Sequence, residues 1–147
     1  MLTLHVSVNG EKKVIEGLQN IRGKAKDLRP AFRIAGGFIM ESVGRTFRAG
    51  GRPEAWKPLS KATLKRRGQG ALILQDIGTL MTSIGAKSGD GIMVLKPLEL
   101  RVGTNVPYAR YHQEGIGVPA RPFMQLLPED EEKIVKAITE HIMGGEK

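Results

Sequence analysis

The sequence predicts an α+β fold in which a small antiparallel sheet has long helices packed on one face. Apolar residues recur every three or four positions from Val14 to Thr46, which is the spacing of a buried helical stripe. Apolar and polar residues alternate within 92–102, as in paired strands with one solvated face. A proline followed by acidic residues at 128–132 is typical of the start of another helix.

Length and composition limit the class of protein. The 147 residues suit a single domain over 1–147, because a chain of this size buries most of its surface in one core. The chain has no cysteine, which excludes disulfides, thiolate nucleophiles and sulfur-ligated zinc. No segment approaches the roughly 20 apolar residues of a transmembrane helix, so we expect no membrane association. Segment 1–13 lacks the apolar run of a signal peptide, so we expect no export by that route.

The N-terminal third is predicted to contain a strand and a broken helix. Segment 2–8 alternates apolar and polar residues, which indicates a half-buried strand. The long helical stripe is interrupted by Pro30, so we predict a break or kink at 27–30. Gly36 and Gly37 weaken the second half of this helix by about 1 kcal/mol each relative to alanine, unless another element packs closely there.

A basic segment rich in glycine and proline follows at about 49–71, and we call it the excursion. Irregular segments of this length in a compact domain are usually functional or disordered, and we predict that this one is mobile. Ser60 is the predicted cap of a short helix over 61–67. The basic lobe overlaps the excursion and consists of Arg45, Arg48, Arg52, Lys57, Lys61, Lys65, Arg66 and Arg67. In a chain of net charge +8, this lobe either attracts phosphates or an acidic protein face, or is a solvated loop.

Three further elements complete the predicted fold. A short helix near 76–83 has Asp76 as its possible cap. The two strands within 92–102 bend at 95–98. The C-terminal helix begins at Pro128 and ends at Gly144. Its predicted buried stripe consists of Ile134, Val135, Ile138 and Ile142.

The segment "GTNVPYARYHQEG", residues 103–115, contains the side chains that most resemble a catalytic set. However, His112 and Glu114 are two positions apart, which places them on different sides of a helix. The chain contains no HExxH, GxSxG, phosphate-binding or dinucleotide-binding motif, and its histidines are scattered at positions 5, 112 and 141. We therefore expect no enzymatic activity, no metal site and no cofactor.

The same segment can instead form a contact surface. Pro107 suits the start of a short helical turn, and Gly115 suits its end. Within the turn, Tyr108 is three residues from Tyr111 and four from His112, so these side chains are neighbours on one face. Aromatic side chains with polar tips are typical of subunit contacts. We therefore favour a shaped interface over a catalytic site.

Trp56, the only tryptophan, lies in the excursion beside Lys57 and Pro58. Its ring could stack on a nucleobase or on a partner's side chain. Alternatively, it anchors the excursion to the core. The absence of a second aromatic residue nearby in the sequence favours the anchor.

Four segments of the chain resemble those of the phage virion morphogenesis family, the Mu-like tail-completion proteins. They are "WKPLSKATLKRR", "LILQDIGTLMTSI", "VGTNVPYARYHQEG" and "PARPFMQLLPEDEEKI", in that order from Trp56 to about Ile134. The most specific part is "GT…YA..HQ.G" followed by "PARPF". One departure is the sequence Asp-Ile-Gly-Thr-Leu at 76–80, where the family usually has a Thr-Gly-x-Leu turn, and it puts the predicted cap of this helix in question.

The resemblance implies a non-enzymatic structural protein of a long-tailed phage or prophage that completes the tail so that the head can join. We expect several copies in a ring, bound to tail and to head or connector proteins, in the tail or neck of the virion after assembly in the host cytoplasm. The interface candidates are Trp56, Tyr108, Tyr111, His112, Arg121 and Phe123. The alternative is a nucleic-acid-binding module that uses the basic lobe, and DNA proximity is left open.

Overall fold

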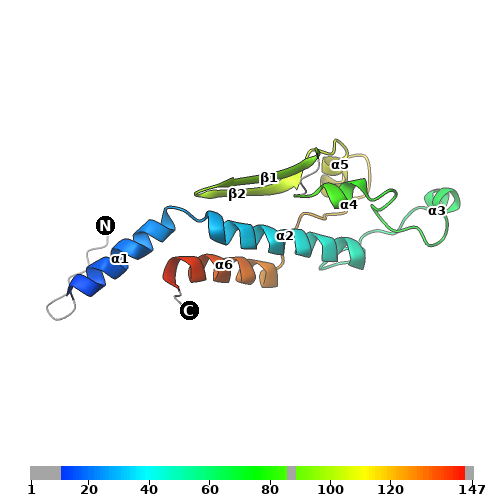
Figure 1. The fold of residues 1–147 in the computed structure, drawn as a ribbon. Helices are drawn as coiled ribbons and strands as arrows, with labels where there is room; N and C mark the ends of the chain where they lie inside the picture. Colours follow the sequence, from blue (N-terminus) through cyan, green and yellow to red (C-terminus); the bar gives the residue numbers. More distant parts are fainter. Residues whose placement is uncertain (1–10, 86–88, 145–147) are drawn as a thin grey trace.

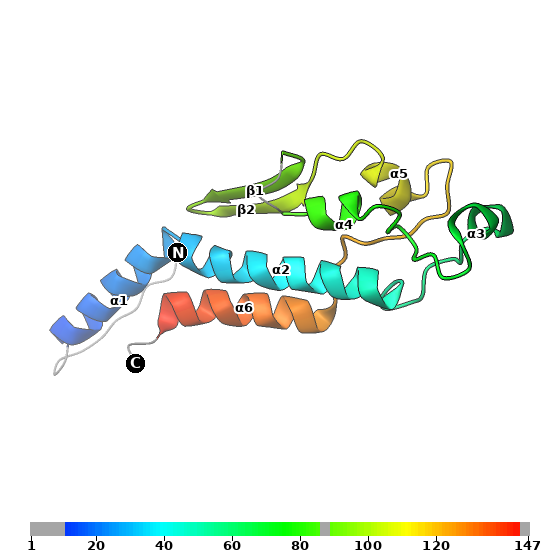
Figure 2. The same ribbon diagram turned by 45° about the vertical axis from the view of Figure 1, so that its right-hand side comes forward.

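Helix α2 (Arg29–Ala49) is the central element of the protein. The computed structural model describes residues 11–85 and 89–144, so the predicted strand at 2–8 lies outside the described residues. In Figures 1 and 2, the hairpin of β1 and β2 lies along one side of α2 and helix α6 (Pro128–Met143) lies along another. A two-stranded antiparallel sheet packed against a mostly helical body confirms the predicted α+β class.

The long helical segment is broken where the sequence predicts it. Helix α1 (Glu11–Ala25) ends before the predicted break, and α2 begins at Arg29 with Pro30 in its first turn. The junction is held by α6, because the His141 Nε2 atom lies 2.7 Å from the Asp27 carbonyl oxygen and donates to it. The Lys24 ammonium group in turn donates to the Gly144 carbonyl at 3.0 Å.

The apolar side of α1 is not buried by the described residues, so the N-terminal part of the predicted buried stripe is wrong. The side chains of Val14, Ile15 and Leu18 are exposed. Helix α1 extends beyond the end of the α2 and α6 pair in both ribbon views, so only its C-terminal end contacts α6 (Figures 1 and 2). The predicted stripe is buried only in α2, at Ala35, Val43 and Thr46.

The hairpin confirms the predicted pair of strands. Strand β1 (Gly91–Lys96) and strand β2 (Glu99–Thr104) pair antiparallel, with Lys96 opposite Glu99 at the turn. The turn is tied to the start of α2, because the Leu28 amide donates to the Pro97 carbonyl at 2.8 Å. Gly36 is buried under the hairpin, where a Cβ atom would lie 3.3 Å from the Met93 Cε atom. Close packing therefore accounts for the glycine at position 36, whereas a Cβ at Gly37 would meet no described atom within 4 Å.

Helix α6 begins at Pro128 and ends at Met143, with Gly144 as its C-cap, as predicted. The predicted buried stripe is wrong at Val135, whose side chain is 61% exposed. The buried positions are Asp130 and Ala137, which share one face of α6. The face is set by packing against α2, which places Asp130 against Ser42.

An aromatic cluster forms the centre of the core. The Phe47 ring lies 5.5 Å from the ring of Trp56 and 5.5 Å from that of Phe123. The Trp56 indole also donates to the Pro122 carbonyl at 2.9 Å, so the anchor interpretation of Trp56 is confirmed. Gly51 is buried as well, and a Cβ there would lie 2.5 Å from the Trp56 amide nitrogen. The excursion is therefore well packed at its start, and its mobility over about 49–71 stays a prediction.

Two short helices follow Trp56. Helix α3 (Lys61–Arg67) has the predicted cap, because the Ser60 hydroxyl oxygen accepts from the Thr63 amide at 3.2 Å. Helix α4 (Thr79–Ser83) is shorter than predicted, and the Asp76 cap is wrong. The N-cap is Gly78, whose left-handed φ of 77° stops the helix from starting earlier. Asp76 instead forms an ion pair with α3.

Candidate functional site

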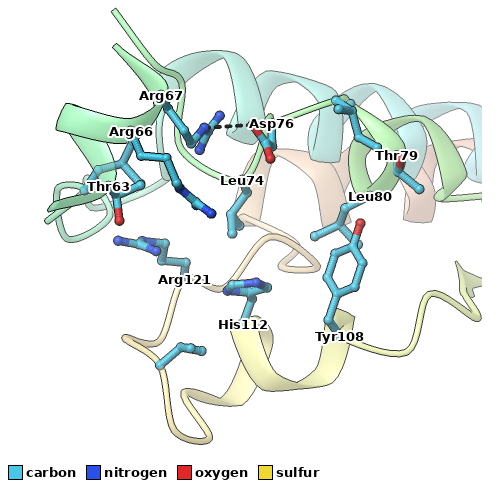
Figure 3. Close-up of a pocket in the computed structure, with 14 residues that line it drawn as sticks. Thr63, Arg66, Arg67, Leu74, Asp76, Thr79, Leu80, Tyr108, His112 and Arg121 are labelled. Carbon is cyan, nitrogen blue, oxygen red and sulfur yellow. Dashed lines mark ion pairs between the residues drawn. The ribbon is translucent and has the colours of Figure 1, made fainter. Parts of the chain in front are cut away.

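A cleft of about 580 Å³ lies between α3, α4 and α5 (Ala109–Glu114), as Figure 3 shows. This volume is within the range of roughly 300–1,000 Å³ that is typical of ligand pockets. The basic lining residues are Arg66 and Arg67 of α3 and Arg121 of the loop before α6. The apolar part of the lining includes Leu80 of α4 and Tyr108 before α5. The cleft therefore combines positive charge with apolar surface.

Helix α5 positions two of the predicted residues in this cleft. As predicted, the helical turn follows Pro107 and ends at Gly115, which has a left-handed φ of 74°. The Tyr108 and His112 rings pack edge to face with their centroids 6.0 Å apart, and both line the cleft. The side chains of Tyr108 and Tyr111 are 42% and 48% exposed, but Tyr111 does not line the cleft. The structure thus brings together Tyr108 and His112 and leaves Tyr111 on the outer surface.

The surroundings of His112 disfavour the protonated form of its imidazole. Burial lowers the pKa of His112, and the positive charge of Arg121 lowers it further. The Nδ1 atom of His112 is buried and has no hydrogen-bond partner among the described residues. The side chain of His112 lines the cleft, and its Nδ1 atom is reached neither by solvent nor by a hydrogen-bond partner among the described residues.

Gln113 connects the two most specific sequence motifs, and the sequence reasoning did not select it. Its side-chain oxygen accepts from the Phe123 and Met124 amides, each at 3.0 Å, and its Nε2 atom donates to the Met124 carbonyl at 3.2 Å. The Arg121 amide donates to the His112 carbonyl at 2.7 Å. The sequence signal for this contact was the order of the two motifs, "HQ.G" followed closely by "PARPF". In the structure the first segment forms hydrogen bonds with the second.

The Arg121 side chain fastens the excursion to the cleft. It is buried, and it donates to the Lys57 carbonyl at 3.0 Å and to the Pro58 carbonyl at 3.1 Å. Burial lowers the pKa of Arg121. Trp56 and Phe123 are buried too, so three of the predicted interface residues lie in the interior. In the single chain the two aromatic rings pack in the core and the guanidinium binds the excursion, and an interface role for these residues stays a prediction.

The basic lobe is divided by ion pairs rather than being one positive surface. Arg45 pairs with Asp130, Arg52 with Glu129 and Arg67 with Asp76, each at 2.9 Å. The exposed members are Arg48, Lys57, Lys61, Lys65 and Arg66. Of these, Arg66 alone lines the cleft, and Lys57 lines a second, smaller cleft of about 360 Å³ beside Trp56.

Two features found in other classes of protein are absent from the described part of the chain. Among residues 11–85 and 89–144, no three histidine or acidic side chains cluster as metal ligands would. In the same residues, no helix has the length and apolarity to cross a bilayer.

Comparison with known proteins gives two matches. The family model for the phage virion morphogenesis family matches residues 10–143. Mu-like prophage FluMu G protein 2 of Haemophilus influenzae is 32% identical over 146 residues, which cover 94% of this chain and 95% of that protein. No solved structure matches the chain.

Proposed function

Because the chain belongs to the phage virion morphogenesis family, we propose that it completes the tail of a long-tailed phage or prophage so that the head can join. The family comprises structural morphogenesis proteins that are typically non-enzymatic. The proposed partners are tail proteins and head or connector proteins. The proposed location is the tail or neck of the virion, after assembly in the host cytoplasm.

The proposed mode of action is a ring of several copies, and two unlike exposed surfaces support it. One surface is the apolar side of α1, where the Leu18 side chain is 47% exposed. The other surface, on and after α5, includes Tyr111 and Ile116, which are also exposed. Helices α1 and α5 lie toward opposite ends of the molecule in both ribbon views (Figures 1 and 2). A contact between unlike surfaces repeats from copy to copy and can close into a ring.

Nucleic-acid binding by the basic lobe is less well supported. Arg45, Arg52 and Arg67 are already paired with carboxylates, so they are less available to phosphates. Phosphate binding weakens steeply as salt is added, whereas contacts between apolar surfaces do not. Assembly that persists as the salt concentration rises would therefore support the ring.

Complementation tests the proposed function. A lysogen that lacks its own gene for the related tail protein is supplied with this chain, and joined particles are counted by electron microscopy. The unmodified chain should restore head-to-tail joining. Leu18→Asp should abolish joining because it places a charge in the apolar contact of α1. The matched control is Gln19→Asp, which adds the same charge at the next exposed position of α1 and should still complement.

Two results would contradict this proposal. Failure of the unmodified chain to restore joining, despite normal expression in the complemented lysogen, would contradict a role in tail completion. If Leu18→Asp complements as well as Gln19→Asp, the apolar side of α1 is not a contact surface. The ring would then lose one of the two surfaces that support it.

A further inference from the structure

We propose that the cleft between α3, α4 and α5 binds a short segment of a partner protein that carries a carboxylate beside apolar side chains. The inference rests on the proposed function, because the partner would be a component of the tail or head. It adds the chemistry of the contact, which neither the family nor the relative specifies.

Uncompensated positive charge at the α3 end of the cleft favours a carboxylate. Arg66 is exposed and has no ion-pair partner among the described residues. Arg121 is buried, and its hydrogen bonds are to the neutral carbonyls of Lys57 and Pro58. By contrast, Arg67 is already paired with Asp76. Figure 3 shows Arg66 and Arg121 toward the same end of the cleft. A carboxylate placed there would form charge-assisted hydrogen bonds, which are roughly twice as strong as neutral ones.

Apolar side chains at the other end favour an apolar neighbour for that carboxylate. Tyr108 is exposed at this end, and the cleft lining also includes the exposed side chains of Ile77 and Val118. Leu80 is buried below them, and Figure 3 shows it near Tyr108 at the end away from Arg66. Exposed apolar side chains gathered around a concave surface are typical of a binding site for a partner.

The His112 side chain lies between these two ends in Figure 3, with Arg121 on one side and Tyr108 on the other. A segment that joined a carboxylate at one end to an apolar side chain at the other would therefore cross the imidazole of His112.

A protein segment fits this cleft better than a nucleic acid or the α1 surface of another copy. A phosphate backbone needs a row of free cations, whereas Arg66 is the single exposed lobe residue that lines the cleft without a carboxylate partner among the described residues. Helix α1 is net basic through Arg22 and Lys24, so it would be repelled from a basic cleft.

The test uses the full chain and a fluorescein-labelled peptide of alternating leucine and aspartate, with binding followed by fluorescence anisotropy. A peptide with asparagine in place of aspartate isolates the effect of the carboxylates. We expect the aspartate peptide to bind at least about tenfold more tightly than the asparagine peptide. Arg66→Glu should weaken binding of the aspartate peptide by about tenfold or more. Lys61→Glu, the same charge change on α3 outside the cleft, should weaken it by less than about threefold.

Several outcomes would overturn the inference. They are equal binding of the two peptides, equal losses for the two charge variants, and tighter binding of an oligothymidylate that also depends on Arg66. If circular dichroism shows that Arg66→Glu does not fold, Ile77→Ser replaces it, because Ile77 is highly exposed and its apolar side chain lines the cleft. If the aspartate peptide does not bind through Arg66 but the chain still complements the lysogen, the cleft assignment is refuted. The proposed role in tail completion is then unaffected.

Discussion

The carboxylate of Asp130, at the start of α6, accepts a hydrogen bond from the hydroxyl of Ser42 in α2. The same carboxylate pairs with Arg45 at 2.9 Å and accepts from the Leu127 amide at 3.1 Å. Burial alone would raise the pKa of Asp130, but these hydrogen bonds and the charges of Arg45 and Arg52 outweigh it and lower the pKa. One buried carboxylate thus joins the two longest packed helices and caps the second.

Removal of this carboxylate should destabilise the protein. Asp130→Ala leaves Ser42 and the Leu127 amide without their partner, and we expect a loss of about 2–4 kcal/mol in the free energy of unfolding. Urea denaturation followed by the fluorescence of Trp56 measures the change. Glu131→Ala, at the next and exposed position, is the control and should change stability by less than about 0.5 kcal/mol. Equal losses for the two variants would show that Asp130 contributes through the helix dipole alone.

Stability should depend on pH through His112. The pKa of His112 is lowered in the folded protein, whereas the unfolded chain binds the proton near pH 6.5. Below that pH the unfolded state therefore holds more protons, so the free energy of unfolding falls as the pH drops from about 6.5 toward the folded pKa. Denaturation at pH 7.5 and 5.5 measures this loss. His112→Gln should reduce the loss, and an unchanged pH dependence in that variant would contradict the assignment.

The two hydrogen bonds from Arg121 to the Lys57 and Pro58 carbonyls should require a guanidinium group. Arg121→Lys can donate to the Lys57 or the Pro58 carbonyl, but a single ammonium does not reproduce the forked geometry. We expect a loss of about 1–2 kcal/mol and faster hydrogen exchange at 58–70. Arg110→Lys, an exposed position on α5, is the matched control and should leave both measurements nearly unchanged. Slow exchange at 58–70 in the unmodified protein would contradict the predicted mobility of that part of the excursion.

The two adjacent glycines of α2 should respond differently to alanine. Gly37→Ala should stabilise the protein by up to about 1 kcal/mol, because no described atom lies within 4 Å of the new Cβ and alanine favours the helix. Gly36→Ala should gain less or lose stability, because the Met93 Cε atom lies 3.3 Å from the new Cβ and must move. Thermal denaturation of both variants gives the comparison. A larger gain at Gly36 than at Gly37 would mean that the hairpin does not pack on α2 as described.

Part of the candidate site could be predicted from the sequence because its geometry is local. Tyr108 and His112 are four residues apart on a short helix, and the structure places their rings in contact. The contacts of Gln113 with Phe123 and of Arg121 with Lys57 could not be predicted, because they join segments whose approach depends on the whole fold. The cleft exists only through those contacts, so its lining could not be identified in advance.

The sequence by itself determined the features that are set within a few residues of backbone. Pro30 and Pro128 suit only the first turn of a helix, and the Ser60 hydroxyl reaches the amide three residues ahead. The tertiary structure decided which side of each element is buried and which partner each charge has. It exposes Val135, and it pairs Asp76 with α3 in place of a helix cap. The physical reason is that periodicity defines a possible buried face, whereas burial requires a second element whose packing determines which residues leave the solvent.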